Sequence, residues 1–183
     1  MNNDAIQVTQ RWWQAMFLTA EQLRSKGIMP ASTAQRAQLK RCNNLDATML
    51  SEGFRNLWLS LPESITAKPK AEIIECWAAI AAALVFVTTD SEISLACAAG
   101  KKGDGDKSIV SELRFTQLQN AKTADEFLRR LRRILLQIGG VTSVKQLTKD
   151  IYQWFSEHNN FRPLTPANRI AVCWAMDYYQ AAK

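Results

Sequence analysis

Histidine is almost absent from this sequence of 183 residues, in which only His158 could supply an imidazole. The cysteines are few and scattered, since Cys42, Cys76, Cys97 and Cys173 form no C-x-x-C pair. Structural zinc sites need closely spaced cysteine and histidine ligands. We therefore expect no metal site, and we expect four free thiols in or near the core, as is usual in a reducing compartment.

Catalytic motifs are missing as well. A Ser-His-Asp or Cys-His site would have to use His158, which stands in the polar stretch SEHNNFRP, where we expect an exposed helix end and loop. The GDGD stretch at 103–106 lacks the ligand pattern of a calcium loop, and neither a phosphate-binding P-loop nor a dinucleotide fingerprint occurs. The sequence therefore predicts a protein that is not an enzyme and that needs no cofactor.

The sequence also lacks a hydrophobic run long enough for a membrane span. Its longest apolar run, IIECWAAIAAALVFV at 73–87, is shorter than the roughly 20 residues that a span requires, and it contains Glu75. No basic segment followed by an apolar one opens the sequence, as it would in a secretory leader. We expect no membrane association, a cytoplasmic protein, and a buried helix at 73–87.

Apolar residues recur at helical intervals through most of the sequence, and few segments alternate as strands do. The predicted fold class is therefore all-α. Capping-box patterns at 123–126 and 143–146 mark two helix starts, and Gly27, Pro62 and the pair at 139–140 mark helix ends. The expected helices cover 3–27, 32–42, 49–62, 69–88, 123–138, 143–155 and 165–182.

The composition changes at 98–108, where AAGKKGDGDKS holds three of the seven glycines together with three lysines. Glycine and charge at this density are typical of a mobile loop or an interdomain linker. We therefore expect two small helical-bundle domains, at 1–99 and 109–183, joined by a mobile basic loop at 100–108.

Positive charge is concentrated in one part of the sequence. The formal net charge is +6, and the window 101–149 holds 11 Lys and Arg against 5 Asp and Glu, while the remainder holds 12 of each. Such an asymmetry is typical of proteins that bind a polyanion such as nucleic acid.

Four arginines of this window lie on one predicted helix, in the stretch EFLRRLRRILLQIGG. At about 100° per residue the apolar residues of 127–138 share the core face, and Arg129 and Arg133 project opposite it. Arg130 and Arg132 lie on the two flanks. Like charges at this spacing destabilise an isolated helix by a few tenths of a kcal/mol per pair, so the arrangement favours either a solvated basic face or an anionic partner.

Further basic residues are expected to extend this surface. Because lysine and arginine bind phosphates without reading bases, several basic ridges across the molecule suit a track for a nucleic-acid backbone. They are Arg36, Lys40 and Arg41 on the second predicted helix, Lys101, Lys102 and Lys107 in the loop, and Arg114 before the arginine helix.

Four stretches resemble a known protein family. RAQLKR at 36–41, LRFTQLQNAKTADEFLRRLRRIL at 113–135, IYQWF at 151–155 and AVCWAMDYY at 171–179 are similar to the small subunit of the type I-E CRISPR Cascade complex, the CasB family. Their order and spacing run through most of the chain, and the second stretch is the most specific.

The resemblance implies an all-helical, two-domain, non-enzymatic subunit. In such complexes two copies of the subunit pack head to tail beside the repeated guide-RNA-binding backbone subunits. The subunit would help to hold the crRNA-paired target DNA and the displaced single strand, and so stabilise the R-loop.

The residues that the resemblance assigns to nucleic-acid binding come from its first two stretches. They are Arg36, Lys40, Arg41, Arg114, Arg129, Arg130 and Arg133, and charge alone adds Lys101, Lys102 and Lys107. Arg132 is left out because it leans toward the core boundary, where it can pair with a neighbour. Two other classes stay open: a helical adaptor whose basic faces bind acidic protein partners, and a nuclease or other enzyme.

Overall fold

The structure, a computed structural model, describes residues 2–103, 105–159 and 165–183. Asp104 of the predicted loop and the end of the SEHNNFRP stretch lie outside the described residues. The elements in chain order are α1 (Asn3–Phe17), α2 (Ala20–Lys26), α3 (Thr33–Arg41), α4 (Leu45–Met49), α5 (Glu52–Ser60), α6 (Glu63–Thr66), α7 (Ala71–Leu84), β1 (Thr89–Asp90), α8 (Leu95–Gly100), α9 (Glu112–Gln119), α10 (Ala124–Gln137), β2 (Val141–Thr142), α11 (Val144–Asn159), the 3-10 turn η1 (Pro166–Asn168) and α12 (Ile170–Ala181).

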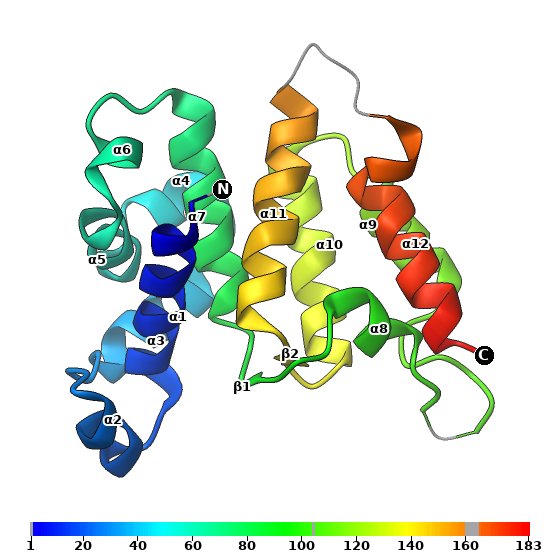
Figure 1. Ribbon diagram of the computed structural model, residues 1–183, viewed down its shortest axis with the longest axis horizontal. Coiled ribbons are helices and arrows are strands. Elements are labelled where there is room, and N and C mark those ends of the chain that lie inside the picture. The colour runs from blue at the N-terminus through cyan, green and yellow to red at the C-terminus, as the bar shows by residue number, and fades with distance from the viewer. Residues whose placement is uncertain (1, 104, 160–164) are drawn as a thin grey trace.

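The all-α prediction is confirmed, with β1 and β2 as two short parallel strands beside the helices (Figure 1). Within the described part of the chain, no helix is long and apolar enough to cross a membrane. The thiols of Cys42 and Cys76 are buried, and burial raises the pKa of Cys76, but Cys173 is exposed. The expectation of four core thiols is therefore wrong for Cys173, which lies on the outer side of α12.

The predicted first helix is interrupted at Thr19. The Thr19 hydroxyl accepts a hydrogen bond from the Gln22 amide at 3.3 Å, and the Gln22 side chain accepts one from the Thr19 amide at 3.0 Å. This capping box starts α2, which Gly27 ends in the left-handed conformation. Because each short helix supplies its own caps, the segment forms two helices instead of one.

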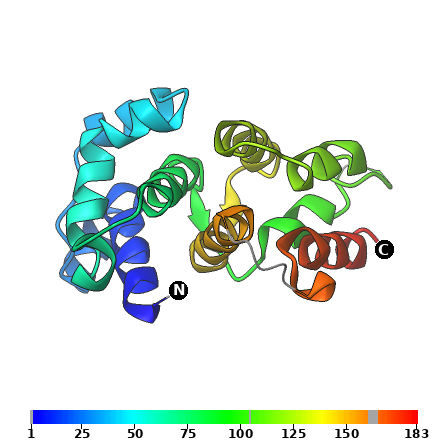
Figure 2. The same ribbon diagram turned by 90° about the horizontal axis from the view of Figure 1, so that it is seen from above.

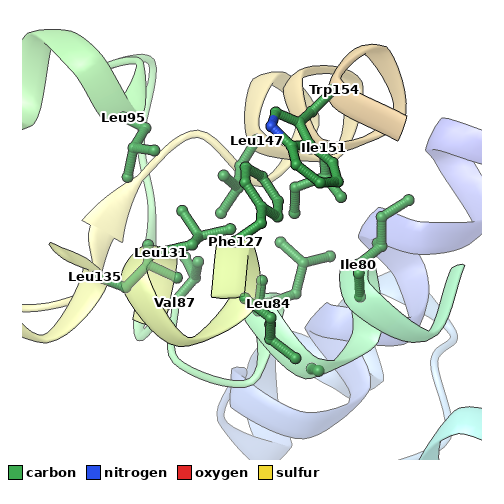
Figure 3. Close-up of a cluster of buried hydrophobic side chains, with 14 of the residues drawn as sticks. Ile80, Leu84, Val87, Leu95, Phe127, Leu131, Leu135, Leu147, Ile151 and Trp154 are labelled. Carbon is green, nitrogen blue, oxygen red and sulfur yellow. The ribbon is translucent and has the colours of Figure 1, made fainter. Parts of the chain in front are cut away.

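Helix α7 lies between the N-terminal helices and the pair α10 and α11 (Figure 1). Its nine residues from Cys76 to Leu84 are all buried, because α4 and α5 pack on one side of the helix and α10 and α11 on the other. Figure 3 shows Ile80 and Leu84 of α7 meeting Phe127 and Leu131 of α10. One continuous hydrophobic core therefore joins the N-terminal and C-terminal parts of the chain.

The predicted linker at 100–108 lies at the outer edge of the C-terminal half (Figure 1). The short helix α8 precedes it and packs closely along α12, where a Cβ atom on Gly100 would come within 2.3 Å of the Tyr178 carbonyl oxygen. Helix α8 thus packs with the C-terminal helices, and the chain leaves α7 for α8 at 85–94. The assignment of 100–108 as the linker stays a prediction. The division into two separate domains stays a prediction.

The crossing segment is fixed by the parallel pair of β1 and β2. Thr89 pairs with Val141 and Asp90 with Thr142, and the Asp90 carboxylate accepts a hydrogen bond from the Val144 amide at 2.8 Å. The Asp90 side chain thus satisfies an otherwise unpaired amide at the start of α11. The strands hold the end of α10 and the start of α11 against the end of α7.

Asp150 is a buried carboxylate between α11 and α12. It accepts hydrogen bonds from the Trp174 indole at 2.9 Å and from the Gln146 amide group at 2.8 Å. Desolvation nonetheless raises the pKa of Asp150 from its usual 3.8 to about 6, and the nearby Asp177 adds to the rise. The protonated form is therefore favoured in the folded state more than in the unfolded chain.

This pKa shift predicts a pH-dependent stability. Because the folded-state pKa is raised, the contribution of Asp150 is fully present below about pH 4 and is lost as the pH rises through about 6, by up to about 3 kcal/mol. The amide of the Asp150→Asn variant cannot ionise. The difference in free energy of unfolding between variant and parent should therefore change in favour of the variant by up to that amount between pH 4 and pH 7. Urea unfolding of both chains across this range measures the difference, and parallel pH profiles would contradict the prediction.

Candidate nucleic-acid interface

Helix α10 presents the arginines, and its first turn is strongly capped. The Thr123 hydroxyl accepts a hydrogen bond from the Glu126 amide at 3.2 Å, and the Glu126 carboxylate accepts one from the Lys122 amide at 2.7 Å. The hydrogen bond from Lys122 lowers the pKa of Glu126, and Arg130 and Arg129 lower it further. The helix therefore begins with a fixed negative charge that offsets part of the arginine cluster.

Arg129 and Arg133 project from α10 into solvent, as predicted. Both side chains are exposed, while Phe127, Leu131 and Leu135 on the opposite face are buried. Among the described residues neither guanidinium has a hydrogen bond, ion pair or ring contact. These two cations are therefore available to an anion.

Arg130 is engaged within the protein. Its guanidinium forms an ion pair with Glu126 at 2.5 Å and donates a hydrogen bond to the backbone carbonyl of Gln117. It thus ties α10 to α9, and only a quarter of its side chain is exposed. Its predicted role in nucleic-acid binding stays a prediction, since much of its hydrogen-bonding capacity is already used.

Arg132 lies against the core boundary, in agreement with its exclusion from the predicted site. Its Nε donates to the Ala82 carbonyl at 2.9 Å, and its Nη1 donates to the Cys42 carbonyl. The guanidinium carbon lies 5.1 Å from the centre of the Phe86 ring, and burial lowers the pKa of the group. Arg132 therefore joins the C-terminal ends of α3 and α7 to the middle of α10.

The basic ridge of α3 lies next to this junction. Lys40 is exposed, with its ammonium 6.0 Å from the centre of the same Phe86 ring that Arg132 covers, and Arg41 is exposed beside it. Arg36 is half-buried, with its guanidinium over the Phe17 ring and a hydrogen bond to the Met16 carbonyl at 3.3 Å. The structure thus brings Lys40 and Arg41 close to α10, while Arg36 is partly used in packing α3 against α1.

A hollow of about 340 Å³ lies between α9 and α10, on the other flank of the arginine helix. Three of the predicted residues, Arg114, Arg130 and Arg133, meet in its lining. The remaining lining residues are Gln117, Ile134, Leu136 and Gln137, which the sequence reasoning did not single out. The spacing of Arg114 with Gln117, and of Arg133 with Gln137, could have placed each pair on one helix face.

The three helices that carry these residues lie on one side of the molecule. In Figure 2, α11 and α12 lie on the side that faces the viewer of Figure 1. Helices α9, α10 and α3 lie on the opposite side. Because α10 is in the middle, Arg129 lies between the α3 ridge and the α9 hollow, and Arg133 lines that hollow. We call this surface, made of Lys40, Arg41, Arg114, Arg129 and Arg133, the basic face.

The loop that carries the lysines extends beyond α8, at the outer edge of the C-terminal half (Figure 1). The loop closes on itself. The Gly103 amide donates a hydrogen bond to the Lys107 carbonyl at 2.9 Å, and the backbones of Lys102 and Ser108 form an antiparallel bridge. The Lys102 ammonium also lies 3.6 Å from the Asp106 carboxylate. Lys101 is exposed. The loop is therefore held by contacts of its own, and a role of its lysines in nucleic-acid binding stays a prediction.

The remaining candidates for chemistry are His158 and possible groups of metal ligands. His158 is exposed, stacks on Trp154 and contacts the Lys122 carbonyl at 2.7 Å, so it packs against the end of the helix pair. In the ranges that the structure describes, no group of three or more His, Cys, Asp and Glu residues could hold a metal ion.

Comparisons with known proteins point to one family. The sequence profile described as CRISPR-associated protein Cse2 matches residues 35–179. No curated protein sequence matches the chain. Among solved structures, the chain is similar to one in the crystal structure of Escherichia coli Cascade bound to a PAM-containing double-stranded DNA target, with a TM-score of 0.64 and 18% sequence identity over 100% of this chain and 98% of that chain. This likeness shows a shared fold.

Proposed function

Because the chain belongs to the CRISPR-associated Cse2 family, the small subunits of type I-E Cascade, we propose that its basic face holds the separated DNA strands in an RNA-guided surveillance complex. The strands would be the crRNA-paired target strand and the displaced strand of the R-loop. The partners would be the other Cascade subunits, including the repeated guide-RNA-binding subunit, together with a second copy of this chain. The protein would act without catalysis, in the cytoplasm.

The observation that carries the proposal is the set of unpaired cations on the basic face. In the described part of the chain, Arg114, Arg129, Arg133 and Arg41 form neither an ion pair nor a hydrogen bond, although Arg129 lies near enough to Glu126 to lower its pKa. Exposed cations within one or two helical turns repel one another, so the arrangement lowers stability slightly unless an anion neutralises it. A phosphate backbone supplies anions at regular spacing.

Phosphate contacts of this kind suit a DNA strand whose sequence is recognised by another part of the complex. In RNA-guided complexes the sequence is read by base pairing with the guide, and opening of the duplex is nearly balanced in free energy. A few phosphate contacts that ignore sequence can therefore shift the balance toward the open state. The basic face would provide such contacts along α3, α10 and α9.

The proposal is tested by fluorescence anisotropy of the purified chain with labelled single-stranded DNA of two unrelated sequences, over a series of salt concentrations. If three to five phosphates are engaged, the logarithm of affinity should fall against the logarithm of salt with a slope of roughly −2 to −3.5, alike for both sequences. If the chain instead binds an acidic protein and does not bind the labelled DNA at low salt, the helical adaptor would be favoured.

The double variant Arg129→Ala/Arg133→Ala should weaken DNA binding without unfolding the protein. Loss of two phosphate contacts makes the salt slope shallower by roughly 1.4, whereas both side chains are exposed and their loss should leave the melting temperature nearly unchanged. The matched control is Arg24→Ala/Lys26→Ala on α2, which removes two exposed cations outside the basic face. An equal loss of binding in the control would contradict the assignment to α10.

A further inference from the structure

The hollow between α9 and α10 combines charge with an apolar wall. Leu136 lines it together with the three arginines and is 64% exposed although it lies among charged residues, whereas the neighbouring Ile134 is buried. Phosphate binding needs no such wall, because phosphates are bound by charge and hydrogen bonds. An exposed leucine inside a basic hollow instead suits a ligand that has an apolar surface as well as negative charge.

The Arg130 guanidinium has a fixed orientation in this hollow. Its ion pair with Glu126 and its hydrogen bond to the Gln117 carbonyl hold it from two helices at once. A guanidinium that is held in this way offers its planar face for stacking, and nucleobases stack on arginine planes as they do on aromatic rings.

The other polar groups of the hollow are available. Across the described residues, Arg114 and Arg133 have no partner, and the side-chain amides of Gln117 and Gln137 make no hydrogen bond. An amide group both donates and accepts hydrogen bonds, so two of them can meet the polar edge of any base. The volume of about 340 Å³ lies at the lower end of the range of roughly 300–1,000 Å³ that small-molecule pockets occupy.

We propose that this hollow binds one unstacked nucleobase of the single strand that the basic face holds, an inference that rests on the proposed function. The base lies against Leu136 and stacks on the Arg130 plane, while Arg114 and Arg133 bind the phosphates on either side of it. The glutamine amides face its edge without selecting one base. A base seated there is withdrawn from pairing, so the pocket would oppose reclosure of the opened strand.

The test compares two labelled strands of equal length and phosphate number, one of thymidines and one of abasic deoxyribose units. Stacking of a base contributes enough affinity that the thymidine strand should bind at least about five-fold more tightly to the full chain. Equal binding of the two strands would overturn the inference and leave the proposed function intact. Failure to bind either strand at low salt would overturn both.

A variant separates this pocket from stacking elsewhere on the surface. Leu136→Ser should bind the thymidine and abasic strands alike, while Leu59→Ser, which alters a leucine of α5 that is 80% exposed, should keep the discrimination. Since both leucines are exposed, the melting temperatures of the two variants should match that of the parent chain. Discrimination that persists in Leu136→Ser would overturn the assignment to this hollow.

Discussion

Gly140→Ala should lower the free energy of unfolding by about 3–5 kcal/mol. Gly140 has φ of 70°, and a Cβ atom there would lie 2.5 Å from the Phe86 carbonyl oxygen and 3.0 Å from the Thr88 amide nitrogen. Neither backbone atom can move without breaking the hydrogen bonds from the Thr88 and Thr89 amides to the Gly140 carbonyl, at 2.8 and 3.2 Å. The substitution therefore strains both the end of α10 and the crossing between the halves.

The neighbouring glycine is the matched control. Gly139 has nearly the same φ, 67°, but a Cβ atom there would meet no atom within 4 Å. Gly139→Ala should therefore lose only the left-handed conformational preference, about 1–2 kcal/mol. Urea unfolding of the two variants measures both effects, and equal losses would show that contact with residues 86–88 contributes nothing.

Arg132→Ala should lower the free energy of unfolding by about 3–5 kcal/mol, because the substitution removes two hydrogen bonds that involve a charged donor. The carbonyl of Ala82 has no substitute partner in the helix, since the Phe86 amide donates to Ala83 instead, at 2.9 Å. The contact of the guanidinium with the Phe86 ring is lost as well. Urea unfolding at neutral pH measures the change.

Arg133→Ala is the control for this substitution, since Arg133 is the next residue of the same helix and is exposed. Its effect on stability should stay within about 0.5 kcal/mol. At temperatures where both variants are folded, Arg133→Ala should bind DNA more weakly than Arg132→Ala, because Arg133 belongs to the basic face and Arg132 does not. Similar stability losses in the two variants would contradict the role of Arg132 as the junction of α3, α7 and α10.

Local patterns in the sequence predicted the longer helices but missed α4, α8 and α9, the last of which carries Arg114. The start of α10 at the capping pattern of 123–126 and the exposure of Arg129 and Arg133 follow from helical periodicity alone. The break at Thr19 also has a local signal, the T-x-x-Q capping pattern, which lies inside a longer amphipathic stretch. A continuous apolar stripe does not reveal such a break, because both helices bury the same side.

Tertiary contacts decide the features that the sequence could not predict. Glycine serves both flexible loops and close approaches of backbone, so Gly100, which packs α8 against α12, was interpreted as part of a linker. The difference between Arg132 and Arg133 in burial depends on the positions of α3 and α7. The hollow that gathers Arg114 with Arg133 depends likewise on the angle between α9 and α10, which no local pattern contains.

The burial of α7 on all sides bears on the order in which the chain can fold during synthesis. When the ribosome has released only the first hundred residues, α4 and α5 can cover one side of α7, but α10 and α11 do not yet exist. In Figure 3, side chains of α10 and α11 cover the apolar surface of Ile80 and Leu84. This surface stays exposed until about residue 155 has emerged from the ribosome. During synthesis the N-terminal half therefore exposes apolar surface that is prone to aggregation, and its core is completed late.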